Sequence, residues 1–159
     1  MKQIIKRSAL LIVMTGAIIF YSCKKDKDDS TPAKTKTELI TTGSWKLTAF
    51  TVNPARDIDG DGTAETDVYS KAPACVKDNF TIFKTNSEGE DNEGATKCNS
   101  ADPQIKQWSW NFNSDETHLL FDGFDYTIAD LTASTLKLTD IYFDANTFTL
   151  YTYQITYGH

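Results

Sequence analysis

IKQWSWNFN, residues 105–113, is the stretch that decides the fold of this 159-residue chain. The aromatic residues Trp108, Trp110 and Phe112 occupy every second position, and polar residues stand between them. Successive side chains of a β-strand point to opposite faces of the sheet, so this alternation is typical of a strand with one face in a core. The stretch therefore predicts a strand that contributes three aromatic side chains to the interior of the domain.

The segments on both sides of this strand carry the same two-residue period. Asp122-Gly123 separates two alternating runs and is a strong sign of a two-residue β-hairpin. Towards the N-terminus, Trp45, Leu47 and Ala49 alternate with polar residues. Residues 86–92 are predicted to form a polar turn around Gly89. The predicted strands are 44–52, 64–70, 79–85, 93–98, 105–113, 117–121, 124–129, 134–143 and 146–157.

The connections between these strands are short, and no long helical pattern interrupts them. Short loops favour neighbours that pair in chain order and antiparallel. We therefore expect an all-β fold, a small antiparallel up-and-down β-barrel of about eight strands. The interior of such a barrel accommodates side chains or one small ligand. A two-sheet β-sandwich is the alternative.

The last two predicted strands change their apolar face part-way. In residues 134–143, Leu136 and Leu138 give way to Ile141 and Phe143, which stand on the opposite face. Residues 146–157 show the same change. A β-bulge or a strong bend in each strand would explain it.

The N-terminus has the features of an export signal. Basic residues precede an apolar run of 13 residues, Ala9–Tyr21, which is shorter than the roughly 20 residues that span a membrane as a helix. Cys23 follows at once after Ser22, and this pattern resembles the lipobox of bacterial lipoproteins. The resemblance implies that residues 1–22 are a signal peptide, that Cys23 becomes the first residue and carries lipid, and that its acyl chains attach the protein to the membrane.

Residues 23–36 are predicted to be a lipidated cysteine followed by a flexible tether, because Lys24–Lys36 contains no aromatic residue and no aliphatic residue other than Ala33. The Lys/Asp cluster 24–29 resembles the signal that sends some lipoproteins to the outer face of the outer membrane. We therefore expect a lipid-anchored location at the outer membrane, facing the cell surface; a plain solvated spacer is the alternative. Residues 37–159 remain as one domain, which is long enough to bury its own core.

The charge of the chain excludes one class of partner. There are 16 basic and 22 acidic side chains, and three of the basic ones lie in residues 1–22. The mature chain therefore has 13 against 22, a net charge of −9. Such a surface repels phosphate backbones, so we exclude nucleic acid as a partner.

Two cysteines remain once Cys23 is assigned to lipid. An exported protein meets an oxidising compartment, where Cys75 and Cys98 most simply pair as a disulfide. Two reduced, buried thiols are the alternative.

An acidic loop, residues 57–67, follows the first long strand. Aspartates at alternate positions followed by Gly62 match the first six positions of a calcium-binding loop, in which several carboxylates converge on one cation. The twelfth position is Val68 instead of glutamate, so the loop is not an EF-hand. A solvated Asp/Gly turn is the alternative. The predicted ligands of a structural Ca²⁺ are Asp57, Asp59, Asp61, Thr63 and Asp67.

Gly43-Ser44-Trp45 opens the first long strand after a short helical turn and resembles the G-x-W motif of the lipocalins. The run 73–83, followed by Gly94, Cys98 and the W-x-W strand, is similar to the lipocalin-like domains of bacterial lipoproteins. This resemblance covers roughly residues 39–157. It implies a barrel in the cell envelope, with a small hydrophobic ligand. The motif and interior residues that it assigns are Gly43, Trp45, Trp108, Trp110, Phe112 and Tyr126.

Nothing in the sequence pairs a nucleophile with a base. We therefore expect a non-enzymatic, lipid-anchored envelope protein with a lipocalin-like barrel that binds a small hydrophobic ligand, and no organic cofactor. The alternative is a calcium-stabilised module for surface adhesion or glycan binding.

Overall fold

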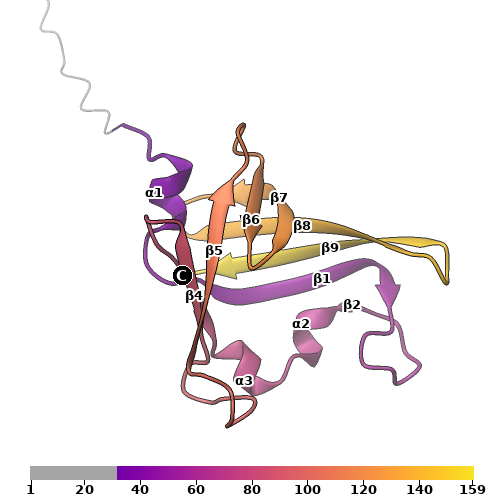
Figure 1. Cartoon of the computed structure of the whole chain (residues 1–159). Helices are drawn as coiled ribbons and strands as arrows, with labels where there is room; N and C mark the ends of the chain where they lie inside the picture. Colours follow the sequence, from indigo (N-terminus) through magenta and orange to yellow (C-terminus); the bar gives the residue numbers. More distant parts are fainter. Residues whose placement is uncertain (1–31) are drawn as a thin grey trace, which may run out of the picture. The chain divides into compact units, whose positions relative to one another are not determined.

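The computed structural model describes residues 32–159. The chain divides into two units, Met1–Pro32 and Ala33–His159, and the second contains all the elements shown in Figure 1. The predicted signal peptide, Cys23 and most of the tether lie outside the described residues. Within residues 32–159, none of the helices has the length and apolar character needed to cross a membrane.

Nine strands and three short helices make up the domain. Thr35 caps the first helix, because its hydroxyl accepts the backbone N–H of Glu38 and the Glu38 carboxylate accepts the backbone N–H of Thr35. The elements are α1 (Lys36–Ile40), β1 (Lys46–Arg56), β2 (Glu65–Asp67), α2 (Val68–Lys71), α3 (Ala74–Lys77), β3 (Phe80–Phe83), β4 (Glu88–Asn92), β5 (Ile105–Phe112), β6 (His118–Phe121), β7 (Phe124–Leu131), β8 (Thr135–Asp144) and β9 (Thr149–Gly158).

The strands form one antiparallel sheet in the order β2-β1-β9-β8-β7-β6-β5-β4-β3, so the all-β, antiparallel prediction is confirmed. The sheet is open, and the continuous closure of a barrel is not found in the described residues. β3, at one end of the sheet, meets the start of β1, the second strand from the other end, at one isolated bridge, where the backbones of Trp45 and Thr81 exchange two hydrogen bonds of 2.8 Å. Only the start of β1 reaches β3, because its second half pairs with β2 from Thr51 to Arg56.

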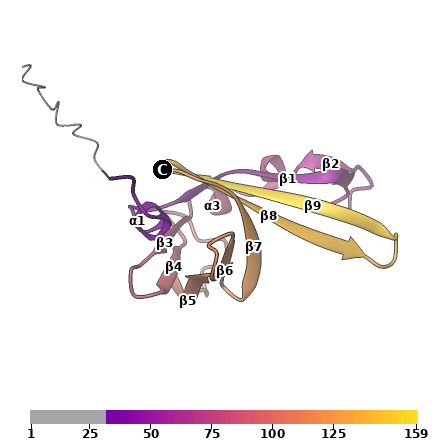
Figure 2. The same ribbon diagram turned by 90° about the horizontal axis from the view of Figure 1, so that it is seen from above.

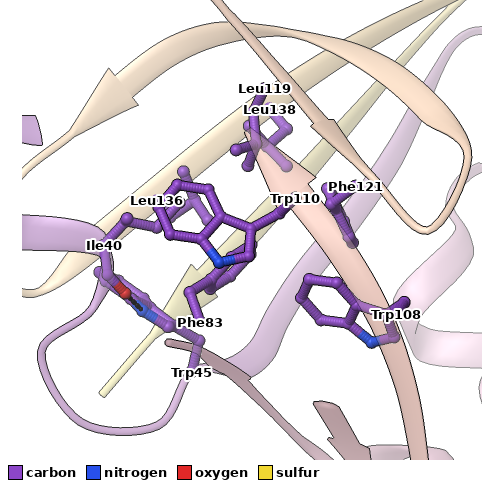
Figure 3. Packing of buried hydrophobic residues seen from close by; sticks show 9 residues of the cluster. All are labelled: Ile40, Trp45, Phe83, Trp108, Trp110, Leu119, Phe121, Leu136 and Leu138. Atoms are coloured by element: carbon purple, nitrogen blue, oxygen red, sulfur yellow. Dashed lines mark hydrogen bonds between the residues drawn. The ribbon is translucent and has the colours of Figure 1, made fainter. Parts of the chain in front are cut away.

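Figure 3 shows how the buried side chains of the main core pack against one another. The ring of Phe83 contacts Trp108 and Trp110 edge-on, with centroids 5.2 and 5.5 Å apart. Gly89 lies directly opposite Trp108, and a Cβ there would come within 2.0 Å of the indole. The buried members are Ile40, Trp45, Phe83, Trp108, Trp110, Leu119, Phe121, Leu136 and Leu138.

The segment around Gly89 differs from the sequence prediction. Residues 86–92 were expected to form a turn, but Glu88–Asn92 is a strand, β4, between β3 and β5. Gly89 is needed because the indole of Trp108 lies across the strand at this position. Since glycine has no side chain, the alternation that would have predicted β4 was missing from the sequence.

Beyond this core, β8 and β9 continue as a long hairpin (Figure 2). The two strands pair without a register shift from Thr135 to Asp144, so the predicted bulge between them is wrong. The same face stays buried along the whole hairpin: Tyr151 is in phase with Ile155 and Tyr157 of the main core, and in the outer half it packs with Val52 and Val68. The face it leaves exposed carries the apolar side chains of Ile141, Phe143, Phe148 and Leu150.

Two weak strands were also predicted wrongly. Residues 64–70 form only the short β2 before α2 begins, because the Asp67 carboxylate accepts the backbone N–H of Ser70 at 3.0 Å and caps the helix. Residues 93–98 are an irregular loop that ends at Cys98. Cys98 bonds to Cys75 in α3 over a Cα–Cα distance of 5.2 Å, so the predicted disulfide is confirmed.

Candidate functional site

Two pockets lie side by side near the start of β1. The first, which we name the acidic pocket, has a volume of about 260 Å³ and is lined by Leu47, Val76, Asn79, Thr81, Asp91, Glu93, Lys106 and Tyr157. The second, the apolar pocket, has a volume of about 360 Å³ and is lined by Leu47, Phe50, Ile58, Asp59, Val68, Tyr69, Lys71, Ala72 and Val76. Leu47 and Val76 belong to both.

The register of the sheet brings the acidic pocket together. Leu47 of β1 stands opposite Tyr157 of β9, and Asp91 of β4 stands between Thr81 of β3 and Lys106 of β5. Directly opposed residues share one face of a sheet. The bridge between Trp45 and Thr81 sets these two groups around one space.

The carboxylate of Asp91 is the central charge of the acidic pocket. The hydroxyl of Thr81 donates a hydrogen bond of 2.7 Å to Asp91 Oδ1. Burial raises the pKa of Asp91 above its ordinary value, and the hydrogen bond from Thr81 opposes that shift. Burial likewise raises the pKa of the Tyr157 hydroxyl. Both groups have lost much of their hydration, so a polar ligand placed between them would meet little competition from water.

Lys106 is the basic residue that lines the acidic pocket, and it already has a partner. Its Nζ lies 2.6 Å from Asp122 Oδ2, and this contact raises the pKa of Lys106. Asp122 stands at the β6–β7 turn and is not among the residues that line the pocket. Lys106 therefore divides its charge between Asp122, which it contacts directly, and Asp91, so it compensates the carboxylates of the pocket only in part.

A buried donor lies close by. The indole Nε1 of Trp108 is buried and has no hydrogen-bond partner among the described residues. Trp108 belongs to the face of β5 that also carries Lys106, and it stands one strand away from Asp91. The indole N–H lowers the pKa of Asp91 against the effect of burial, so the buried donor and the partly desolvated carboxylate interact, at a looser geometry than an ordinary hydrogen bond.

The apolar pocket lies between β1 and the helices α2 and α3. Val68, at the start of α2, is buried against Val52 of β1. The disulfide of Cys75 holds α3 to the 93–98 loop, and the neighbouring Val76 contributes to both pockets. Asp59 and Lys71 are the charged groups in a lining that is otherwise apolar apart from the Tyr69 hydroxyl.

The acidic loop brings together three of its five predicted calcium ligands. One carboxylate oxygen each from Asp57, Asp59 and Asp61 lie within 4.8 Å of one another, and all three residues are exposed. The carboxylate of Asp67 instead caps α2, and the backbone N–H of Thr63 donates to Asp61 at 2.7 Å. Three of the five predicted ligands therefore lie together in the structure, Asp67 is engaged at the start of α2, and the five-residue set stays a prediction.

Lys71 neutralises the loop from α2. Its Nζ lies 2.8 Å from Glu65 Oε1, 3.0 Å from Asp59 and 3.3 Å from Asp61. These contacts raise the pKa of Lys71, that with Glu65 most. The carboxylate of Asp57 accepts the backbone N–H groups of Gly60 and Gly62. A calcium ion at Asp59 and Asp61 would compete with Lys71 for the same oxygens, and Ca²⁺ at this loop stays a prediction.

The residues assigned from the lipocalin resemblance lie elsewhere. Trp45 is fully buried, donates from Nε1 to the backbone oxygen of Ile40 at 2.7 Å, and packs against the ring of His159 with centroids 4.0 Å apart. Gly43 adopts a positive φ of 73° at the turn before it. Trp108 and Trp110 are buried in the main core, with Phe112 and Tyr126 packed against it. None of these residues lines either pocket.

Sequence reasoning missed the residues that do line the acidic pocket. Asp91 and Glu93 fell in a stretch interpreted as a turn and a weak strand, and Tyr157 was only one of several aromatic residues in the last strand. The period-two spacing of Gly89, Asp91 and Glu93 was the available signal. It could not be recognised, because polar residues at inward positions look like a solvated face.

The titratable side chains that line the two pockets are Asp59, Asp91, Glu93, Tyr69, Tyr157, Lys71 and Lys106, and no Cys, His or Ser is among the lining residues. No family model matches this sequence, and none of the curated proteins compared with it matches.

Proposed function

We propose that this chain is a non-enzymatic, lipid-anchored protein of the bacterial cell envelope whose lipocalin-like, barrel-like domain binds a small apolar ligand. The observation that carries the proposal is the apolar pocket of about 360 Å³ between β1 and the helices α2 and α3. Binding sites for small molecules are concave, mostly apolar and about 300–1,000 Å³ in volume, with a few polar groups that set orientation. In this pocket, Asp59 and Lys71 are the polar groups that would set the orientation of the ligand.

The proposed ligand site is not the middle of the barrel-like core. That region is filled by the rings of Phe83, Trp108, Trp110 and Phe121, which contact one another at centroid distances of 5.2–5.6 Å. Space remains on the helix side of β1, where only four-residue helices cover the sheet. Short helices leave gaps over a sheet face that longer helices would fill.

Binding is tested with N-phenyl-1-naphthylamine, a neutral probe whose fluorescence rises in apolar surroundings. The full chain should raise its fluorescence, and Ala72→Trp should abolish the rise, because the indole would fill the pocket that Ala72 lines. Ala145→Trp is the matched control, since Ala145 is exposed in the β8–β9 turn. Equal fluorescence with the two variants would overturn the proposed site.

The anchor is tested separately. The sequence pattern at Cys23 supports lipidation, so globomycin, which blocks the lipoprotein signal peptidase, should make the uncleaved precursor accumulate. Cys23→Ser should abolish the incorporation of labelled fatty acid into the protein. Normal processing under the drug, with labelled fatty acid still incorporated by Cys23→Ser, would exclude the anchor without affecting the ligand site.

A further inference from the structure

We propose that the acidic and apolar pockets form one two-part site for a linear amphiphile that carries a primary ammonium group at one end. The ammonium group would lie at Asp91 and Glu93, and the alkyl chain would pass Leu47 and Val76 into the apolar pocket. This inference rests on the proposed function, because it identifies the class of ligand that the apolar pocket takes.

The two pockets are continuous in their walls. Leu47 of β1 and Val76 of α3 line both. On one side of these two apolar side chains the lining becomes charged, and on the other it becomes almost wholly apolar. A ligand that satisfies both sides must itself have one polar and one apolar end.

The residues of the acidic pocket indicate that the polar end of the ligand is positively charged. Asp91 and Glu93 are the acidic groups, and Lys106 is already paired with Asp122 at 2.6 Å. Thr81 donates to Oδ1 of Asp91, and the indole N–H of Trp108 also interacts with this carboxylate, so a ligand would add a charged donor to two neutral ones. A cationic donor forms charge-assisted hydrogen bonds with such a carboxylate, whereas an anionic head group would add to the existing repulsion.

An ammonium group fits this pocket better than a metal ion does. Calcium takes six to eight oxygen ligands and magnesium six, at about 2.0–2.6 Å. The acidic pocket offers two carboxylates next to apolar walls from Leu47, Val76 and the ring of Tyr157. An ammonium group needs only three acceptors, and the carbon chain behind it can use the apolar walls.

The test uses the chain with Cys23→Ser, exported on a signal peptide that the general signal peptidase removes in place of residues 1–22, so that neither lipid nor the apolar leader requires detergent. Isothermal titration calorimetry compares n-decylammonium, 1-decanol and n-decanoate, which share the same chain. We expect n-decylammonium to bind about tenfold or more tightly than 1-decanol, because a hydrogen bond to a charged group contributes a factor of that order. n-Decanoate should bind most weakly.

Variants assign the two ends of the ligand. Asp91→Asn keeps the shape of the side chain and the acceptor for Thr81, and it should reduce the affinity for n-decylammonium to that for 1-decanol. Glu93→Gln should act in the same direction. Asp130→Asn is the matched control, since Asp130 is an exposed carboxylate on β7 outside both pockets. Circular dichroism melts establish that each variant is folded.

The chain end is tested with a series of n-alkylammonium ions. Each added methylene should raise the affinity about fourfold while the chain enters the apolar pocket. Ala72→Trp should abolish this dependence on length.

The outcomes separate this inference from the proposed function. If 1-decanol and n-decanoate bind as tightly as n-decylammonium, and Asp91→Asn changes nothing, the head-group assignment is wrong and the apolar site stands. If only short ammonium ions bind, with no dependence on length, the two pockets are not one site. If none of the amphiphiles binds, both proposals fail.

Discussion

The hydroxyl of Thr81 donates a 2.7 Å hydrogen bond to Oδ1 of Asp91 across the β3–β4 pair, in a pocket that raises the pKa of that carboxyl group. The hydrogen bond fixes the carboxylate towards the pocket, while burial makes its charge costly. A charge that is held in place at a cost to the fold is typical of a binding group.

Asp91→Asn should therefore stabilise the domain near neutral pH. The pKa of Asp91 is raised above its ordinary value of 3.8 in the folded state, so the folded state binds its proton more tightly than the unfolded state does. As pH rises from about 4 through the raised pKa, ionisation of Asp91 removes stability, and the loss persists at higher pH. Urea unfolding at a series of pH values measures the effect.

In that comparison, the free energies of unfolding of the wild type and Asp91→Asn should coincide best at the acidic end and separate as pH rises, with the variant above. Asp130→Asn provides the control for loss of one exposed negative charge. A variant that is less stable than the wild type at pH 7 would show that the Asp91 charge supports the fold.

Removing Lys71 should make the acidic loop sensitive to calcium. Its Nζ occupies the space next to Asp59 and Asp61 and carries its charge throughout the neutral range. In Lys71→Met, these carboxylates repel one another, and millimolar Ca²⁺ should raise the melting temperature more than it does in the wild type. Lys46→Met, at an exposed position on β1, is the control.

Melting curves recorded with CaCl₂ and with a chelator test whether Ca²⁺ competes with Lys71 for the carboxylates of the acidic loop. Equal shifts in the wild type and Lys71→Met would show that the ion and the lysine do not compete. A calcium-dependent rise in Lys71→Met that disappears in Lys71→Met/Asp59→Ala would locate the ion in the loop.

Loss of the Cys75–Cys98 disulfide should lower both stability and ligand affinity. The bond joins residues 23 apart, and closing a loop of that size contributes about 3 kcal/mol in the chain-entropy model. Cys75 also precedes Val76, which lines both pockets, so release of α3 should loosen the ligand site. Urea unfolding and probe binding of the Cys75→Ala/Cys98→Ala variant measure the two effects.

Reductant supplies the control for this variant. Dithiothreitol should lower the stability and the ligand affinity of the wild type to about the level of the double variant. It should leave both properties of the double variant unchanged. Full ligand affinity in the double variant would mean that α3 keeps its place without the bond.

Leu138→Ala should lower the free energy of unfolding far more than Leu150→Ala does, although both residues lie in the β8–β9 hairpin. Leu138 is fully buried in the main core, whereas Leu150 is 56% exposed on the outer face. Truncation of a buried leucine costs about 2–5 kcal/mol, and substitution at an exposed site usually changes stability by about 0.5 kcal/mol or less. Urea unfolding of both variants measures the difference. A large loss in Leu150→Ala would indicate that the exposed face is covered in solution.

The parts of the fold that could be predicted are those with local causes. Asp122 and Gly123 both adopt positive φ, as the predicted two-residue hairpin requires, and β6 and β7 pair on either side of them. The alternation of Trp108, Trp110 and Phe112 correctly placed one face of β5 in the core. Turn chemistry and two-residue alternation act within a few residues, so they are visible without the rest of the chain.

The candidate site could not be predicted in the same way. Asp91 faces Tyr157 across the domain because the bridge at Thr81 brings the start of β1 to β3. Lys71 enters the acidic loop because α2 starts at the Asp67 cap. Neither contact has a local signature, since the partners lie 10 to 66 residues apart in sequence.

An antiparallel all-β domain with Cys75 and Cys98 available to pair could be predicted from the amino-acid sequence alone, and so could the buried face of β5. The buried face of the outer β8–β9 hairpin, the place where the sheet remains open and the charges that meet depend on the tertiary structure. The physical reason is that alternation defines two faces of a strand but does not say what covers them. In the β8–β9 hairpin, the face that carries Tyr151 is covered by Val52 and Val68, while Ile141 and Phe143 on the other face remain exposed.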